Sequence, residues 1–177
     1  MKLDVGRRFN ALMRDIGHPV VLAGGARGRV QFENPRPLGT LEFHLPTDAA
    51  QFADVVNRAI AQWFPGASPN ALRAGADGRT LTGVVQGAEI TVGTATHVPA
   101  DTTEIDGFTV PSATESLADT AYTLALATDE QQRERGLLDL LWACRTPRTT
   151  TRCRPPGWRR YAATPTVPHA PPGPPPH

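Results

Sequence analysis

An abrupt change in composition near Pro147 divides the chain and limits how much of it can form a folded core. Ten of the 18 prolines lie between Pro147 and His177, together with five arginines and no acidic residue. Such a segment buries too little apolar surface to offset the entropy lost on ordering. We therefore expect a folded domain over residues 1–146 and a disordered Pro/Arg-rich tail over residues 147–177.

The two segments carry opposite net charges. Residues 1–146 hold 13 basic and 17 acidic side chains, a net charge of −4, whereas the tail carries +5. Three interpretations of the tail stay open. It is the product of a shifted reading frame, consistent with one lysine against 17 arginines in the whole chain; it is an ordinary disordered tail; or it is a basic arm that contacts nucleic acid or a groove for proline-rich ligands.

Length and composition exclude several classes of protein. A chain of 177 residues suits a single domain with its own core. Two cysteines are too few for a disulfide framework or a four-cysteine zinc site. No apolar run approaches the ~20 residues of a membrane span, and the amino terminus is too polar for a signal peptide. We expect a cytoplasmic protein that does not contact membranes.

Hydrophobic periodicity predicts a mixed α/β (α+β) domain. Helical spacing of apolar residues alternates with shorter strand-like runs, and Ser112 with Glu115 forms a capping box. Thr47 is the expected cap of the second long helix. The expected elements are a helix over 3–16, a strand over 19–23, a short helix over 26–32, a strand over 38–45, a helix over 47–64, a hairpin over 80–86 and 89–94, a short strand over 105–110, and helices over 112–127 and 128–144.

Paired glycines follow the first expected strand, in the segment Leu22-Ala-Gly-Gly-Ala26. Gly24 and Gly25 would allow a phosphate to approach the backbone closely, with helix amides directed at it. A tight turn without a ligand is the alternative. The segment is neither a P-loop nor a dinucleotide fingerprint, because the spacing differs and no Lys-Ser/Thr follows.

Glu42 and His44 lie two residues apart on an expected strand and therefore on the same face. Carboxylates at such spacing bind a divalent metal together with nucleotide phosphates. Glu89, on a later strand, would converge on Glu42 if the two strands were neighbours in the sheet. The alternative is the outward polar face of a one-sided strand.

These segments resemble the AbiEii-type toxins of bacterial toxin–antitoxin and phage-defence systems, which have the polymerase-beta-like nucleotidyltransferase fold. The family pattern is Val/Leu-x-Gly-Gly-Thr/Ala-Ala, followed by Arg-x-Thr-x-Asp-Ile/Leu-Asp. The chain has VLAGGARGRV and RPLGTLEFHL at these places, and later VPSATESLADTAYTLAL and RERGLLDLLWA. The resemblance covers most of residues 1–146.

The resemblance implies a nucleotidyltransferase-like mixed sheet flanked by helices. It implies a protein that binds a nucleoside triphosphate with Mg²⁺ and transfers a nucleotidyl group to RNA or protein, with a cognate antitoxin as a partner. Roles carried over by position are Glu42 and Glu89 as catalytic residues, Glu42, His44 and Glu89 as metal ligands, and Gly24, Gly25, Thr40 and Asp139 as nucleotide-binding residues.

The chain departs from the family pattern at three positions. His44 stands at the second metal-binding aspartate, Thr120 near the family lysine, and Gly136 where an aspartate follows the basic residue. Imidazole is a poor Mg²⁺ ligand, because this ion prefers oxygen donors. These departures predict impaired transfer. The alternative hypothesis is a catalytically inactive relative that binds nucleotides or other proteins.

Overall fold

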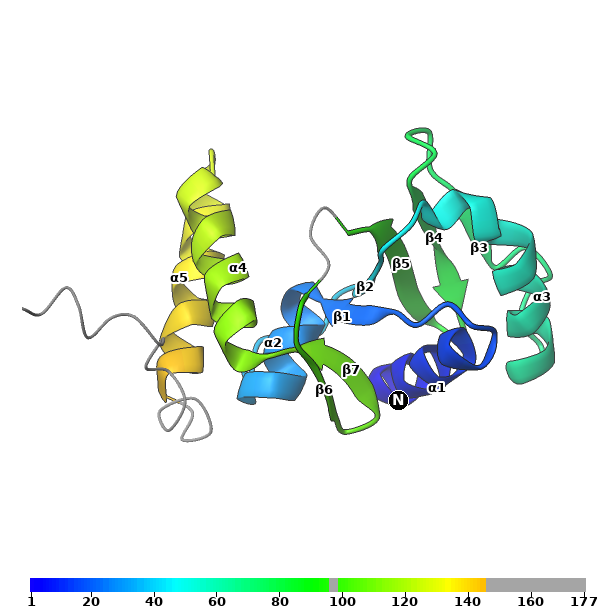
Figure 1. The fold of residues 1–177 in the computed structure, drawn as a ribbon, viewed down its shortest axis with the longest axis horizontal. Coiled ribbons are helices and arrows are strands. Elements are labelled where there is room, and N and C mark those ends of the chain that lie inside the picture. Colours follow the sequence, from blue (N-terminus) through cyan, green and yellow to red (C-terminus); the bar gives the residue numbers. More distant parts are fainter. Residues whose placement is uncertain (96–98, 146–177) are drawn as a thin grey trace, which may run out of the picture.

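A five-stranded mixed sheet forms the centre of the structure, a computed structural model that describes residues 1–95 and 99–145. The strand order is β1-β2-β5-β4-β3 (Figure 1). β2 and β5 run parallel, and the other neighbours are antiparallel. The expectation of a mixed α/β fold is confirmed. The strands are β1 (Val21–Ala23), β2 (Leu41–Leu45), β3 (Leu72–Ala74), β4 (Thr80–Val85) and β5 (Ala88–Thr94).

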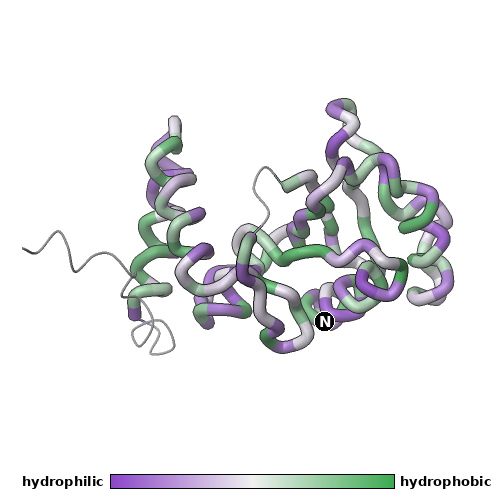
Figure 2. The backbone as a smooth tube through the Cα atoms, in the orientation of Figure 1, coloured by the Kyte–Doolittle hydropathy of each residue, from purple (hydrophilic) through white to green (hydrophobic). Residues whose placement is uncertain are grey.

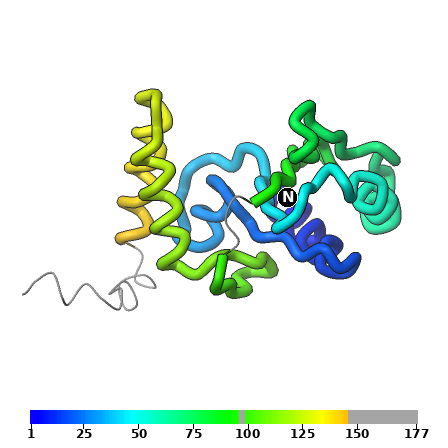
Figure 3. The backbone as a smooth tube through the Cα atoms, turned by 45° about the horizontal axis from the view of Figure 1, so that its top comes forward, coloured from blue at the N-terminus to red at the C-terminus, as the bar shows by residue number. Residues whose placement is uncertain are grey.

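Two helices, α1 (Lys2–Asp15) and α3 (Ala53–Trp63), pack on one face of this sheet. A short helix, α2 (Gly24–Phe32), begins directly after β1. A small second sheet pairs β6 (Thr102–Ile105) with β7 (Phe108–Pro111). Two further helices, α4 (Ala113–Leu126) and α5 (Glu130–Arg145), pack on each other as a hairpin at one side of the molecule (Figures 1 and 3).

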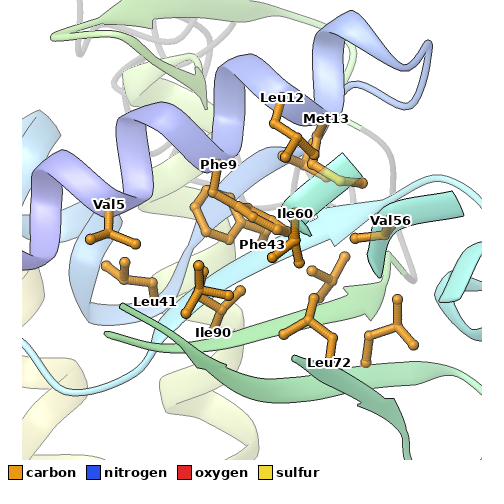
Figure 4. Close-up of a cluster of buried hydrophobic side chains, with 14 of the residues drawn as sticks. Val5, Phe9, Leu12, Met13, Leu41, Phe43, Val56, Ile60, Leu72 and Ile90 are labelled. Carbon is orange, nitrogen blue, oxygen red and sulfur yellow. The ribbon is translucent and has the colours of Figure 1, made fainter. Parts of the chain in front are cut away.

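The alternation of β2 determines which residues enter the core. Leu41, Phe43 and Leu45 are buried, whereas Glu42 and His44 between them are exposed. Figure 4 shows the buried set between the sheet and the two covering helices, where Phe43 meets Phe9 of α1 at a ring-centroid distance of 5.2 Å. The sheet thus has one apolar face under α1 and α3 and one polar face that these helices leave uncovered.

The parallel pairing of β2 and β5 requires a long crossover. Residues 46–87 supply it through a 3₁₀ turn (Ala49–Phe52), α3, β3 and β4. Asn57 of α3 fixes β3 in place, because its side chain donates to the Leu72 carbonyl at 2.8 Å and accepts from the Leu72 amide at 2.9 Å. This buried amide connects the covering helix to the edge of the sheet.

The structure corrects three local expectations. β3 has no counterpart in the sequence prediction. The run expected as one strand over 105–110 is instead a hairpin, which turns at Asp106 and Gly107 with positive φ. Thr47 does not cap the second long helix, which begins after the 3₁₀ turn with Phe52 at its N-cap. The capping box is confirmed, since Ser112 Oγ accepts from the Glu115 amide at 3.3 Å.

Two expectations concern larger parts of the chain. The Pro/Arg-rich tail, residues 147–177, lies outside the described residues, so the proposed domain boundary stays a prediction. Among the helices that are described, none is long and apolar enough to cross a membrane.

Phe43→Ala is expected to destabilise the domain strongly. The ring is fully buried, with 0% exposure, and its removal leaves a cavity between the sheet and α1. The free energy of unfolding should fall by about 3–5 kcal/mol, measured by urea denaturation. Val84→Ala on β4, where the side chain is 55% exposed, is the control and should change little. Equal effects of the two substitutions would contradict the described orientation of the sheet.

Candidate functional site

The uncovered face of the sheet carries a hollow of about 330 Å³. Glu42 and His44 of β2 line it, and the register places Thr91 and Gly93 of β5 beside them. The loop between β3 and β4 and the first residue of β4, Thr80, line its other side. Most of the lining residues have polar side chains, and they come from three adjacent strands and the loop before β4: Glu42, Phe43, His44, Asp77, Arg79, Thr80, Thr91, Gly93 and Thr94.

Gly24 brings the start of α2 against the Glu42 carboxylate. The antiparallel pairing of β1 with β2 sets Ala23 opposite Glu42, so the next residue turns directly over this side chain. Gly24 has φ +57°, and a Cβ there would overlap the carboxylate. Only glycine fits both the left-handed backbone and this close approach. Among the described residues, no hydrogen bond or ion pair reaches the Glu42 side chain, so its carboxylate is available to a ligand.

Glu89 lies on the same face of the sheet but is engaged elsewhere. The parallel register sets Glu42 beside Thr91, so Glu89, two residues earlier, is its diagonal neighbour. The sequence did not determine whether these two strands are neighbours, and the structure shows that they are. Thr40 Oγ1 donates to Glu89 Oε2 at 3.1 Å, which directs this carboxylate to the start of β2.

A polar network attaches α5 beside the second glycine. Arg36 Nη1 donates to both carboxylate oxygens of Asp139, at 3.2 and 3.1 Å. Asn34 supports the pair, since its Nδ2 donates to Asp139 at 2.7 Å and its Oδ1 accepts from the Arg36 amide at 3.0 Å. A Cβ at Gly25 would stand 2.9 Å from Arg36 Nη2. Asp139 therefore does not contact the glycine turn itself but holds Arg36 beside it.

A second ion pair attaches α4 to the first turn of α2. Arg27 is nearly buried, and its Nη1 donates to Asp119 at 2.8 Å while its Nη2 donates to Thr120 at 3.2 Å. A smaller hollow of about 100 Å³ lies next to this pair, between β1, the end of β2 and α4. His44 lines both hollows and so separates them.

The surroundings of His44 favour its neutral form. Although part of the side chain is exposed, desolvation is the main cause that lowers its pKa below the ordinary value of 6.5. The carboxylates of Asp119 and Glu42 oppose this effect, and the Arg27 guanidinium adds to it. A neutral imidazole offers a nitrogen donor and no negative charge, so His44 does not replace the charge of a carboxylate.

The residues present do not fit a centre of two magnesium ions. Glu42 supplies the one free carboxylate of the predicted set, His44 supplies nitrogen, and Glu89 is bonded to Thr40. Within residues 1–95 and 99–145, no group of three or more His, Cys, Asp or Glu side chains could hold a metal ion. One Mg²⁺ carried by nucleotide phosphates does fit, because such ions commonly bind through one carboxylate, phosphates and water.

Two important residues were not identified from the sequence. Arg36 begins the segment RPLGTLEFHL and matches the arginine of the family pattern, which is a usable sequence signal. Arg27 carried no local signal, because its partner Asp119 is 92 positions away. Both arginines lie beside the glycine turn and give it positive charge.

Comparison with known proteins supports the fold alone. No family model matches the sequence, and no curated protein matches significantly. Among solved structures, the chain is similar to the aminoglycoside nucleotidyltransferase ANT(2'')-Ia, an antibiotic-resistance factor. The match has a TM-score of 0.53 and 12% sequence identity, and covers 81% of this chain and 84% of that chain. The fold of this chain is therefore similar to the fold of ANT(2'')-Ia.

Gly24→Ala is expected to lower the free energy of unfolding by about 1–3 kcal/mol, because alanine is strained at this positive φ and meets the Glu42 carboxylate. Gly28→Ala is the matched control within the same helix, since a Cβ there meets nothing closer than 3.8 Å. The control should be neutral or slightly stabilising. Thermal unfolding of both variants measures the difference, and equal behaviour would rule out the described turn.

The stability of the domain should depend on pH through His44. Its folded-state pKa is lowered, so below pH 6.5 the unfolded chain binds more protons than the folded chain. The stability that the neutral imidazole contributes is fully present above the unfolded-state pKa, and it is lost as the pH falls through the folded-state pKa. Urea unfolding at several pH values should give a shallower acid dependence for His44→Gln than for the unchanged protein. Identical slopes would contradict the partial burial of the ring.

Proposed function

We propose that this chain binds a nucleoside triphosphate on the uncovered face of its sheet and is a nucleotidyltransferase-like protein of the AbiEii type with impaired transfer activity. The observation that carries the proposal is the Glu42 carboxylate, which lies against the Gly24 backbone and faces the larger hollow. An acidic group beside the amino terminus of a helix is what a metal-bearing polyphosphate requires. The similarity in fold supports the same assignment.

The phosphates would lie at the start of α2. Gly24 and Gly25 carry no side chains of their own there, and helix amino termini favour anions. Arg36 adds positive charge next to Gly25, held by its ion pair with Asp139. Thr40, bonded to Glu89, borders the same face. The nucleotide-binding roles proposed for Gly24, Gly25, Thr40 and Asp139 are those that the sequence resemblance implies.

Mg²⁺, when bound with the nucleotide, would neutralise phosphate charge, with Glu42 as its protein ligand. In nucleotidyl transfer an acceptor oxygen attacks the α-phosphorus and pyrophosphate leaves. The chain itself contributes binding and orientation at Gly24, Gly25 and Arg36. His44 provides no second carboxylate, so the stabilisation that a second metal gives to the attacking and leaving oxygens is weakened. We propose RNA or protein as the acceptor and a cognate antitoxin as a partner, from the sequence resemblance.

The second candidate is a catalytically inactive relative that binds a nucleotide or another protein. Two observations favour it. His44 brings no negative charge to the position of the second metal ligand, and Glu89 is held by Thr40 instead of facing Glu42. A pocket of this kind retains nucleotide binding without metal-dependent chemistry.

Calorimetric titration of the full chain with each nucleoside triphosphate, with and without Mg²⁺, tests the proposal. Mg²⁺-dependent binding is expected, and Glu42→Gln should weaken it about tenfold or more. Glu104→Gln on β6 is the matched control, because this glutamate pairs with Arg14 in the second sheet. His44→Asp restores a second carboxylate and should strengthen Mg²⁺-dependent binding and increase pyrophosphate release.

The outcomes separate the candidates. Binding that does not depend on Mg²⁺ or Glu42 would favour the inactive relative. Absence of binding by a protein with a normal unfolding transition would overturn the transferase proposal and leave only a relative that binds another protein.

A further inference from the structure

Helix α5 presents an apolar stripe that the rest of the described chain leaves uncovered. Leu137, Leu138 and Leu141 are 52%, 51% and 53% exposed, although leucine side chains are ordinarily buried. Figure 2 shows apolar stretches along the α4–α5 hairpin, which stands to one side of the sheet. Contiguous exposed apolar surface of this kind marks an interaction site.

The stripe faces away from the helix with which α5 already packs. Gly136 contacts Leu124 of α4, and Ala143 is buried, so these residues define the packed face. Leu138 and Leu141 lie on the opposite face, at about 100° of rotation per residue. The hairpin therefore has one side satisfied by internal packing and one side without a partner among the described residues.

Opposite charges flank the leucines with equal spacing. Glu134 precedes Leu138 by four residues, and Arg145 follows Leu141 by four residues. All four side chains are exposed and lie within about 60° of the helix circumference. Within the described part of the chain, neither Glu134 nor Arg145 has an ion-pair partner. Along this side of the helix an acidic residue is thus followed by two leucines and then by a basic residue.

We propose that α5 pairs antiparallel with α5 of a second copy of this chain across a two-fold axis. In that arrangement Glu134 of each copy meets Arg145 of the other, and Leu138 meets Leu141. A two-fold contact must be complementary to itself, and this spacing satisfies that requirement at both ends. Burial of the leucines supplies the apolar centre, and the two ion pairs fix register and direction.

This pairing is independent of the proposed nucleotide site. The hairpin lies beside the sheet, and its exposed stripe does not include any residue that lines the larger hollow. Nucleotide binding and self-association can therefore succeed or fail separately.

Sedimentation of the full chain over a range of concentrations tests the proposal. We expect a reversible dimer with twice the mass of the 19.0 kDa chain. Glu134→Arg and Arg145→Glu each turn both intermolecular contacts into like-charge contacts, and each should raise the dissociation constant roughly tenfold. Arg135→Glu is the control, because it makes the same charge change off the stripe and should leave the dimer intact.

A mixture of the two single variants gives the decisive result. In a heterodimer of the Glu134→Arg chain with the Arg145→Glu chain, both contacts again join opposite charges, so association should return. No folding defect of either variant would produce this recovery. A monomeric unchanged protein would overturn the proposal, whether residues after Arg145 or another protein cover the leucines. A dimer insensitive to the swaps, or a mixture no tighter than its components, would also overturn it.

Discussion

Burial of one face of β2 is the constraint from which the rest of the structure follows. Leu41, Phe43 and Leu45 face α1 and α3, because the apolar sides of these helices are buried on this face of the main sheet. A strand alternates its side chains, so Glu42 and His44 must face the other way. A slip of one residue would bury a carboxylate and an imidazole together. The core therefore fixes the position of the candidate site.

Charged contacts hold the helical hairpin against this framework. Arg27 binds Asp119 of α4, and Arg36 binds Asp139 of α5, both beside the amino terminus of α2. Arg27 is nearly buried, so loss of Asp119 would leave its charge in poor contact with water. The same arginines that anchor the hairpin give the glycine turn its positive charge. Attachment of the hairpin and the electrostatics of the site thus depend on shared residues.

The sequence predicted those features that local patterns determine. The alternation around Phe43 predicted β2, and the paired glycines predicted a special turn at Gly24. β3 was missed, because it is three residues long and depends on Asn57, which lies fifteen positions earlier. The engagement of Glu89 with Thr40 and of Arg36 with Asp139 could not be derived, since each pair meets only after the chain has folded.

The central position of β5 has a consequence for the order in which the protein is built. β5 is the last strand of the main sheet in the sequence, yet it lies between β2 and β4. In a nascent chain that ends before Ala88, the backbone edge of β2 that pairs with β5 is therefore open, and such an edge is prone to aggregation. Parallel pairing over a long crossover is also slow to form. A chaperone at the ribosome exit therefore meets this chain with the edge of β2 open until Thr94 has left the exit tunnel.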